Sequence, residues 1–224
     1  MNVAILGGTG RQGFGLALRW AAAGVSVGIG SRDEARAKEA AARARQVLRD
    51  AGQQVTGELA GLSNDEAGRV ADVVVVTVPA SALEALLVPL QPHLAGKVVI
   101  DVSVSLARRE GRWQAVLPGE GSTALRVRAL LGGHRELAAA FHTVSSAVLA
   151  DLSRELSGDD TLIFSDSEKA AETAATLARF AGLRPVLSGD LRDAATAEHL
   201  VALLLQLQQR HRRRGLGVRL THLS

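Results

Sequence analysis

Short apolar runs alternate along the chain with longer segments whose apolar residues recur at helical spacing. An unbroken apolar run predicts a strand that is buried on both faces, as in a parallel sheet. Such runs occupy residues 2–7, 25–30, 72–79 and 97–103, with a weaker one at 55–59. Helical spacing or capping signals predict helices at residues 14–24, 34–51, 63–70 and 80–90.

The second half of the chain is less regular. Residues 107–121 are polar and contain glycine, which predicts a mobile loop. Beyond them we expect helices at 123–131, 168–181 and 194–213, and strands at 138–144, 161–165 and 184–188. The alternation predicts an α/β fold with a doubly wound, mostly parallel sheet, extra C-terminal strands and a long C-terminal helix.

A glycine-rich stretch, GGTGRQG, follows the first predicted strand and precedes the first predicted helix. Gly8, Gly10 and Gly13 fit the G-x-G-x-x-G pattern of dinucleotide-binding Rossmann-type folds. In that pattern Gly8 permits the tight turn, Gly10 lets a pyrophosphate approach the backbone, and Gly13 lets the helix pack closely on the strand. We expect the whole loop, including Thr9, Arg11 and Gln12, to bind the cofactor at the helix N-terminus.

The end of the second predicted strand indicates which dinucleotide is bound. An NAD site usually has an acidic residue there, whereas this chain has Ser31 and Arg32. A guanidinium and a hydroxyl suit a 2′-phosphate, so we predict NADP(H) as the cofactor. Asp33 is the alternative ribose ligand, but we favour it as the N-cap of the next helix.

Composition excludes several kinds of chemistry. The 224 residues include no Cys and no Tyr, so a disulfide framework, a thiolate metal site and a tyrosine-dependent short-chain dehydrogenase are excluded. The six His are scattered, and we expect no metal site. His142 alone stands out, because it ends a predicted strand and is followed by Thr143, Ser145 and Ser146. It is either a site residue or a hydrogen-bonded His at the edge of the core.

Charge and hydropathy limit the partners. The net charge is +3, and the one basic run, at residues 210–214, has no aromatic residues to stack on bases, so we expect no nucleic-acid binding. The longest apolar region, residues 70–90, contains Asp72, Pro79 and Glu84, so we expect no membrane span. Together with the lack of Cys, this favours a cytoplasmic protein.

Five segments in this order resemble the F420-dependent NADP reductases. They are GGTGRQGFGLALRWAAAG, IGSRD, DVVVVTVPA, AFHTVSSAVLADL and FAGLRPVLSGDL. More distantly, the framework resembles the NADPH-binding domain of the STEAP metalloreductases. The resemblance implies direct hydride transfer between NADPH and the deazaflavin coenzyme F420, with no covalent enzyme intermediate. It also implies a homodimer.

The resemblance also implies roles for individual residues. Thr9, Ser31 and Arg32 match contacts to the 2′-phosphate, and three residues match the wall beside the nicotinamide: Val78, Pro79 and Ala80. The strip beside the deazaflavin, where we place catalysis, is His142, Thr143 and Val144. We assign residues 1–190 to the NADP-binding domain with the acceptor-side strands. Residues 191–224 form a C-terminal helix and tail that complete the acceptor pocket or a dimer interface.

Differences from the family's usual sequence lie on the acceptor side, at Val144-Ser145, residues 165–167 and residues 189–191. Two alternatives therefore stay open. One is an NADPH-dependent flavin or ferric reductase, and the other is a non-catalytic NADP-sensing protein. The residues do not separate them, because hydride transfer needs no acid or base side chain.

Overall fold

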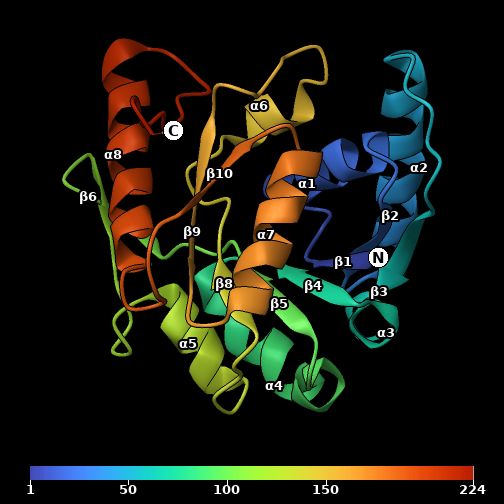
Figure 1. The fold of residues 1–224 in the computed structure, drawn as a ribbon, viewed down its shortest axis with the longest axis horizontal. Helices are drawn as coiled ribbons and strands as arrows, with labels where there is room; N and C mark the ends of the chain where they lie inside the picture. Colours follow the sequence, from blue (N-terminus) through green and yellow to red (C-terminus); the bar gives the residue numbers. More distant parts are fainter. Residues whose placement is uncertain (224) are drawn as a thin grey trace.

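The computed structural model describes residues 1–223, whose centre is an eight-stranded sheet in the order β10-β9-β8-β5-β4-β1-β2-β3 (Figure 1). Neighbouring strands are parallel except β8 and β9, which are antiparallel. The mostly parallel α/β sheet predicted from the sequence is therefore confirmed. The strands are β1 (Asn2–Leu6), β2 (Ser26–Ser31), β3 (Leu59–Ser63), β4 (Val73–Val76), β5 (Val98–Asp101), β8 (Leu137–Ala139), β9 (Asp160–Ser165) and β10 (Arg184–Leu187).

Helices cover both faces of the sheet. They are α1 (Arg11–Ala22), α2 (Glu34–Asp50), α3 (Asn64–Val70), α4 (Leu83–Leu94), α5 (Thr123–Leu130), α6 (Ser146–Ala150), α7 (Glu168–Phe180) and α8 (Ala195–His211), with a 3-10 turn, η1, at Ala80–Ala82. One apolar cluster joins the sheet to α1, α2, α6 and α7. The other joins it to α3, α4, α5 and α8, which gives the doubly wound arrangement.

The central strand β4 shows why an unbroken apolar run marks this fold. All four of its Val residues are buried. Val73 and Val75 belong to one apolar cluster, and Val74 and Val76 belong to the other. Because successive side chains of a strand point to opposite faces, a strand with helices on both sides must be apolar at every position.

The third strand differs from the sequence prediction. It lies at Leu59–Ser63, not at residues 55–59. Its register pairs Val27 of β2 with Leu59. At Gly61 a Cβ atom would lie 2.3 Å from the backbone of Ala37 in α2, so glycine permits close packing of helix on strand. Ala and Gly have low strand propensity, and the tertiary contact overrides that propensity.

The prediction of a mobile loop at residues 107–121 is also wrong in part. Residues Leu106–Arg109 (β6) and Arg112–Ala115 (β7) form an antiparallel hairpin. Both residues of its turn, Glu110 and Gly111, have positive φ, as a type I′ turn requires. The hairpin lies beside α8 (Figure 1), and the backbone N–H of Trp113 donates to the side chain of Gln206 at 3.0 Å.

Three other elements differ from the sequence predictions. The strand predicted at 138–144 ends at Ala139, so His142 lies in a turn. The short helix α6 has no counterpart among the predicted elements. Helix α4 continues to Leu94 through Pro89 and Pro92, because its buried Leu residues hold it against the sheet.

The C-terminal segment closes the far end of the sheet. Val218 forms a bridge with Asp160 at the start of β9, and the Asp160 carboxylate forms a bidentate pair with Arg184 at 2.6 and 2.8 Å. The division at residue 190 stays a prediction. No helix within residues 1–223 is both long and apolar enough to cross a membrane.

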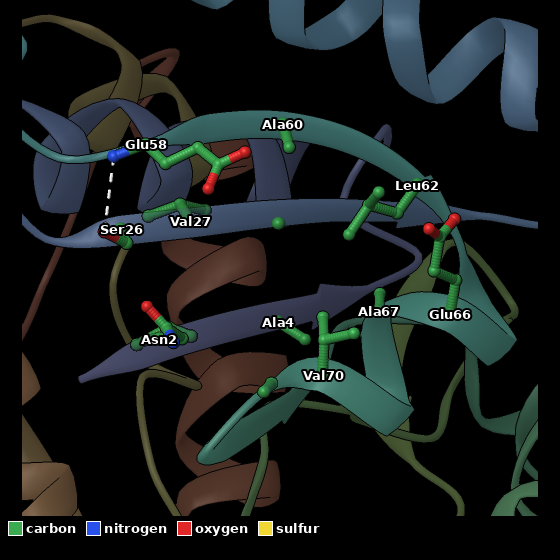
Figure 2. A pocket seen from close by; sticks show the side chains of 13 residues that line it. Asn2, Ala4, Ser26, Val27, Glu58, Ala60, Leu62, Glu66, Ala67 and Val70 are labelled. Carbon is green, nitrogen blue, oxygen red and sulfur yellow. Dashed lines mark hydrogen bonds between the residues drawn. The ribbon is translucent and has the colours of Figure 1, made fainter.

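A cavity of about 320 Å³ lies along the amino-terminal halves of β1 and β2 (Figure 2). Figure 2 shows Glu58 at one of its margins, where the backbone N–H of Glu58 donates to the Ser26 hydroxyl at 3.2 Å. Ligands of doubly wound sheets bind outside the carboxyl ends of the strands. This cavity lies toward the opposite ends, and we assign it no ligand.

Candidate active site

The loop between β1 and α1 has the conformation that a phosphate site needs. The left-handed backbone of this loop lies at Gly7, with φ of 75°, next to the Gly8 to which the motif assigns the tight turn. Gly8 is needed for another reason, since a Cβ there would lie 2.8 Å from the Ile5 carbonyl oxygen. Gly10 is exposed and begins α1 without a side-chain cap, so the first N–H groups of the helix are available to an anion.

Gly13 confirms the expected close packing of helix and strand. A Cβ atom at Gly13 would lie 2.7 Å from both the Gly8 Cα and the Thr77 Oγ1. Thr77 follows β4, and its hydroxyl donates to the Leu6 carbonyl at 2.9 Å. Gly13 thus lets α1 lie directly over the junction of β1 and β4.

A cavity of about 800 Å³ opens at the carboxyl ends of β1, β2 and β4. Of the predicted cofactor-binding residues, six line it: Thr9, Gly10, Ser31, Arg32, Val78 and Pro79. Gly8 and Gly13 are buried and are not among the lining residues. Arg11, Gln12 and Ala80 are not among its lining residues.

The end of β2 presents a hydroxyl and guanidinium groups to this cavity. Ser31 is 7% exposed, and its hydroxyl accepts the backbone N–H of Asp33 at 3.2 Å. Arg32 is exposed, and within residues 1–223 its side chain forms no ion pair. Arg36, one turn into α2, also lines the cavity and was missed by the sequence analysis.

Asp33 is the N-cap of α2, as expected. Its carboxylate accepts the N–H groups of Ala35 at 3.0 Å and Arg36 at 3.3 Å. Because this oxygen already serves the helix N-terminus, Asp33 is a poorer ribose ligand than a free carboxylate.

Asn64, at the start of α3, is a second residue that the sequence analysis missed. Its side chain is 8% exposed, lines the cavity and accepts the Gly7 N–H at 3.2 Å. A Cβ at Gly30 would lie 2.8 Å from the Asn64 oxygen, so Gly30 makes room for this contact. The Ser63 N-cap could be found in the sequence, but nothing in the pattern marks the residue beside it.

His142, Thr143 and Val144 lie in a turn after β8 and do not line the 800 Å³ cavity. Burial lowers the pKa of His142 to about 4, against a smaller upward influence of the Ser103 backbone. The imidazole is therefore neutral at pH 7. Within residues 1–223, neither His142 Nδ1 nor Thr143 Oγ1 has a hydrogen-bond partner, although both atoms are buried.

Asp101 and Ser103 add polar groups at the carboxyl end of β5, next to β8. Asp101 is fully buried, and its Oδ1 accepts the Ser103 N–H at 3.0 Å. Burial raises the pKa of Asp101 to about 7, and the Glu198 carboxylate acts in the same direction. Asp101 Oδ2 and Ser103 Oγ lack partners among the described residues. Neither residue is marked by a motif in the sequence.

Glu198 of α8 is a buried carboxylate whose hydrogen bonds join three segments. It accepts the Thr123 N–H at 2.7 Å, the Thr123 hydroxyl at 2.6 Å and the Ser105 N–H at 3.2 Å. An anion here also suits the N-terminus of α5. Glu198 thus holds α5, α8 and the segment after β5 together.

The profile of the family described as "NADP oxidoreductase coenzyme F420-dependent" matches residues 2–105. The F420-dependent NADP reductase of Methanothermobacter thermautotrophicus is 39% identical, over 100% of this chain and 96% of the relative. The chain belongs to the F420-dependent NADP reductase family. Another member, from Methanocaldococcus jannaschii, is 34% identical over the full length of both chains.

Solved structures support the family's fold for this chain. A protein from Arthrobacter sp. FB24 superposes with a TM-score of 0.79 at 22% identity, covering 99% of this chain and 100% of its own. The Mycobacterium tuberculosis 3-hydroxyisobutyrate dehydrogenase gives a TM-score of 0.64 and covers 94% of this chain and 62% of its own. The likeness in both cases is one of fold.

Proposed function

We propose that this protein is an NADPH:coenzyme F420 oxidoreductase. The observation that carries the proposal is the full-length identity of 34–39% to F420-dependent NADP reductases, in a chain whose glycine loop opens on a cavity of about 800 Å³. When the two cofactors are bound, they supply the chemistry, a hydride passing between nicotinamide carbon 4 and deazaflavin carbon 5. The protein binds them, aligns them and excludes water.

The phosphate end of the proposed NADP(H) site lies at the carboxyl end of β2. Arg32 provides a planar donor group without an ion-pair partner in the described chain, and Ser31 provides a hydroxyl. Thr9 of the glycine loop also lines the cavity, and Arg36 adds a second guanidinium. This donor set suits the 2′-phosphate of NADP better than the free ribose of NAD.

The reacting end of the site is proposed at Val78, Pro79 and Ala80, with the acceptor beside the turn at residues 141–144. Val78 and Pro79 supply apolar groups to the lining of this cavity. The unpartnered Nδ1 of His142 and hydroxyl of Thr143 suit the carbonyl and N–H groups of a deazaflavin. His142 is neutral at pH 7, so its role is to position the acceptor.

Anaerobic incubation with NADPH and F420 tests the proposal. We expect loss of the visible absorbance of F420 at a rate proportional to protein concentration, and much slower turnover with NADH. FMN and a ferric chelate are tested in parallel. Faster turnover with either would assign a flavin or ferric reductase, and NADP binding without turnover of any acceptor would assign a sensor.

We also propose that the protein is a homodimer located in the cytoplasm. What supports an assembly is the apolar face of α8, where Leu203 is 52% exposed. What supports the location is the chain's lack of Cys. Light scattering on the purified protein tests the dimer, and a mass of 23.4 kDa would contradict it.

A further inference from the structure

Helix α1 contacts both parts of the proposed active site. Its N-terminus carries the glycine loop, and its first turn carries Gln12. The side-chain Nε2 of Gln12 donates to the Phe141 carbonyl at 3.1 Å and to the Val144 carbonyl at 3.2 Å. These two carbonyls flank His142 and Thr143. One amide group thus connects the phosphate-binding loop to the turn on the acceptor side.

This turn has an unusual backbone conformation. Phe141 has φ of 65° and is fully buried, although bulky residues rarely adopt the left-handed region. Such a conformation persists only where surrounding contacts fix it. The Phe141 N–H donates to the Thr161 hydroxyl at 2.9 Å, and its ring packs edge-on against Trp20 with 5.7 Å between centroids. Gln12 fixes the carbonyl of the same residue.

The segment after the turn is also held on α1. A Cβ at Gly15 would lie 2.7 Å from the Leu149 Cβ, so α1 and α6 are in close contact. The Arg19 guanidinium donates to four backbone carbonyls, those of Val148, Leu149, Asp151 and Arg154. Among the α1 residues that make these contacts, Gln12, Gly15 and Arg19, Gln12 is nearest the glycine loop. It contacts the carbonyls beside His142.

The turn contains polar atoms that form no hydrogen bond with the described residues. His142 Nδ1 and Thr143 Oγ1 are buried without partners. A buried polar atom without a partner is costly, so a turn that keeps two of them is suited to a ligand that supplies the missing bonds. Their positions depend on the backbone conformation that Gln12 stabilises.

We propose that Gln12 is a positioning residue, which couples the glycine loop to the 141–144 turn and thereby sets the acceptor side against the bound nucleotide. The proposal rests on the proposed function in that the acceptor is F420. The proposal assigns different roles to the backbone and to the side chain of Gln12. The backbone lies in the phosphate-binding loop, whereas the side chain acts on the second cofactor.

The test replaces the amide while keeping the length of the side chain. Gln12→Met removes the donor, and we expect kcat/KM for F420 to fall about 10-fold, as for the loss of one or two hydrogen bonds, mainly through KM. The Kd for NADP+, measured by calorimetry, should change less than twofold. Gln46→Met, the same substitution on the exposed face of α2, is the matched control and should behave as wild type.

Gln12→Glu adds a readout that a merely structural role would not move. Its carboxylate would face two carbonyl oxygens, whereas its protonated form again has one donor. We expect its kcat/KM relative to wild type to recover as the pH falls from 8 to 5. Unchanged F420 kinetics in Gln12→Met would overturn the proposal, as would a loss of NADP+ affinity larger than the loss for F420.

Hydrogen exchange separates failure of this proposal from failure of the proposed function. In the wild type, NADP+ should slow exchange in both the glycine loop and residues 141–145. In Gln12→Met we expect slowing in the loop only. If the wild type does not turn over F420, the proposed function fails, and this exchange pattern still decides the role of Gln12.

Discussion

The buried carboxyl group of Asp101 should make the stability of the protein depend on pH in an unusual direction. Burial raises its pKa from 3.8 to about 7 in the folded protein. Between these two values the unfolded chain has lost a proton that the folded chain keeps. The free energy of unfolding therefore falls as the pH rises through this window. At about 1.4 kcal/mol for each pKa unit, the total is about 4 kcal/mol.

His142 acts in the opposite direction over nearly the same window. Its pKa falls from 6.5 to about 4 on folding, so the unfolded chain binds a proton that the folded chain lacks. This contribution is present above pH 6.5 and is lost as the pH falls to 4. It amounts to about 3 kcal/mol. In the wild type the two contributions largely offset one another.

Single substitutions expose each contribution. For Asp101→Asn, we expect the stability relative to wild type to increase by about 4 kcal/mol between pH 4 and pH 8, because the falling contribution is removed. For His142→Gln, the stability relative to wild type should decrease by about 3 kcal/mol between pH 4 and pH 7. The introduced Asn and Gln side chains do not titrate. They therefore shift the whole curve of stability difference against pH up or down without changing its slope.

Urea unfolding followed by circular dichroism at half-unit pH steps measures both slopes. Subtracting the wild-type curve removes the titration of all shared groups. A flat difference curve for Asp101→Asn would refute the reasoning, because it would mean that Asp101 ionises as readily in the folded chain as in the unfolded one. A difference that decreases with pH would refute it more strongly.

Three further predictions concern the nucleotide site and the sheet. Arg32→Ala should weaken NADP+ binding by about 2–3 kcal/mol and leave NAD+ binding nearly unchanged in calorimetry, and equal losses for the two would exclude a 2′-phosphate contact. Gly10→Val should abolish NADP+ binding while its circular dichroism stays that of the wild type, because the position is open except for the Gly7 oxygen at 3.4 Å. Gly61→Ala should destabilise the protein by about 1–3 kcal/mol in urea unfolding, since its Cβ would overlap the Ala37 backbone, and unchanged stability would show that α2 moves freely.

The sequence was sufficient where local patterns and the fold agree. The all-apolar run that contains β4, the Asp33 cap and the close packing at Gly13 follow from residue chemistry at short range. Those rules also place Ser31 at the edge of the cavity, because β2 must end beside the glycine loop.

Long-range contacts set the features that the sequence did not predict. β3 depends on the close approach of α2 at Gly61, and the role of Asn64 depends on the space above Gly30. The left-handed Phe141 breaks local preference inside residues 138–144, where the pattern predicts a strand. Asp101 lies in an apolar run, where one acidic residue at a strand end gives no sign of its environment.

The three hydrogen bonds of Glu198 also affect the order in which parts of the protein can fold during synthesis. Their donors lie 93 and 75 residues earlier in the chain, so these contacts form only after most of the protein has been synthesised. Contacts of such sequence separation are slow to form because a long loop must close first. A chain interrupted before residue 198 would leave the N–H groups of Ser105 and Thr123 without this acceptor and would expose the side of the β6–β7 hairpin that packs against α8. In every copy truncated before residue 198, proteases would therefore meet a hairpin and a helix α5 that lack their contacts with α8.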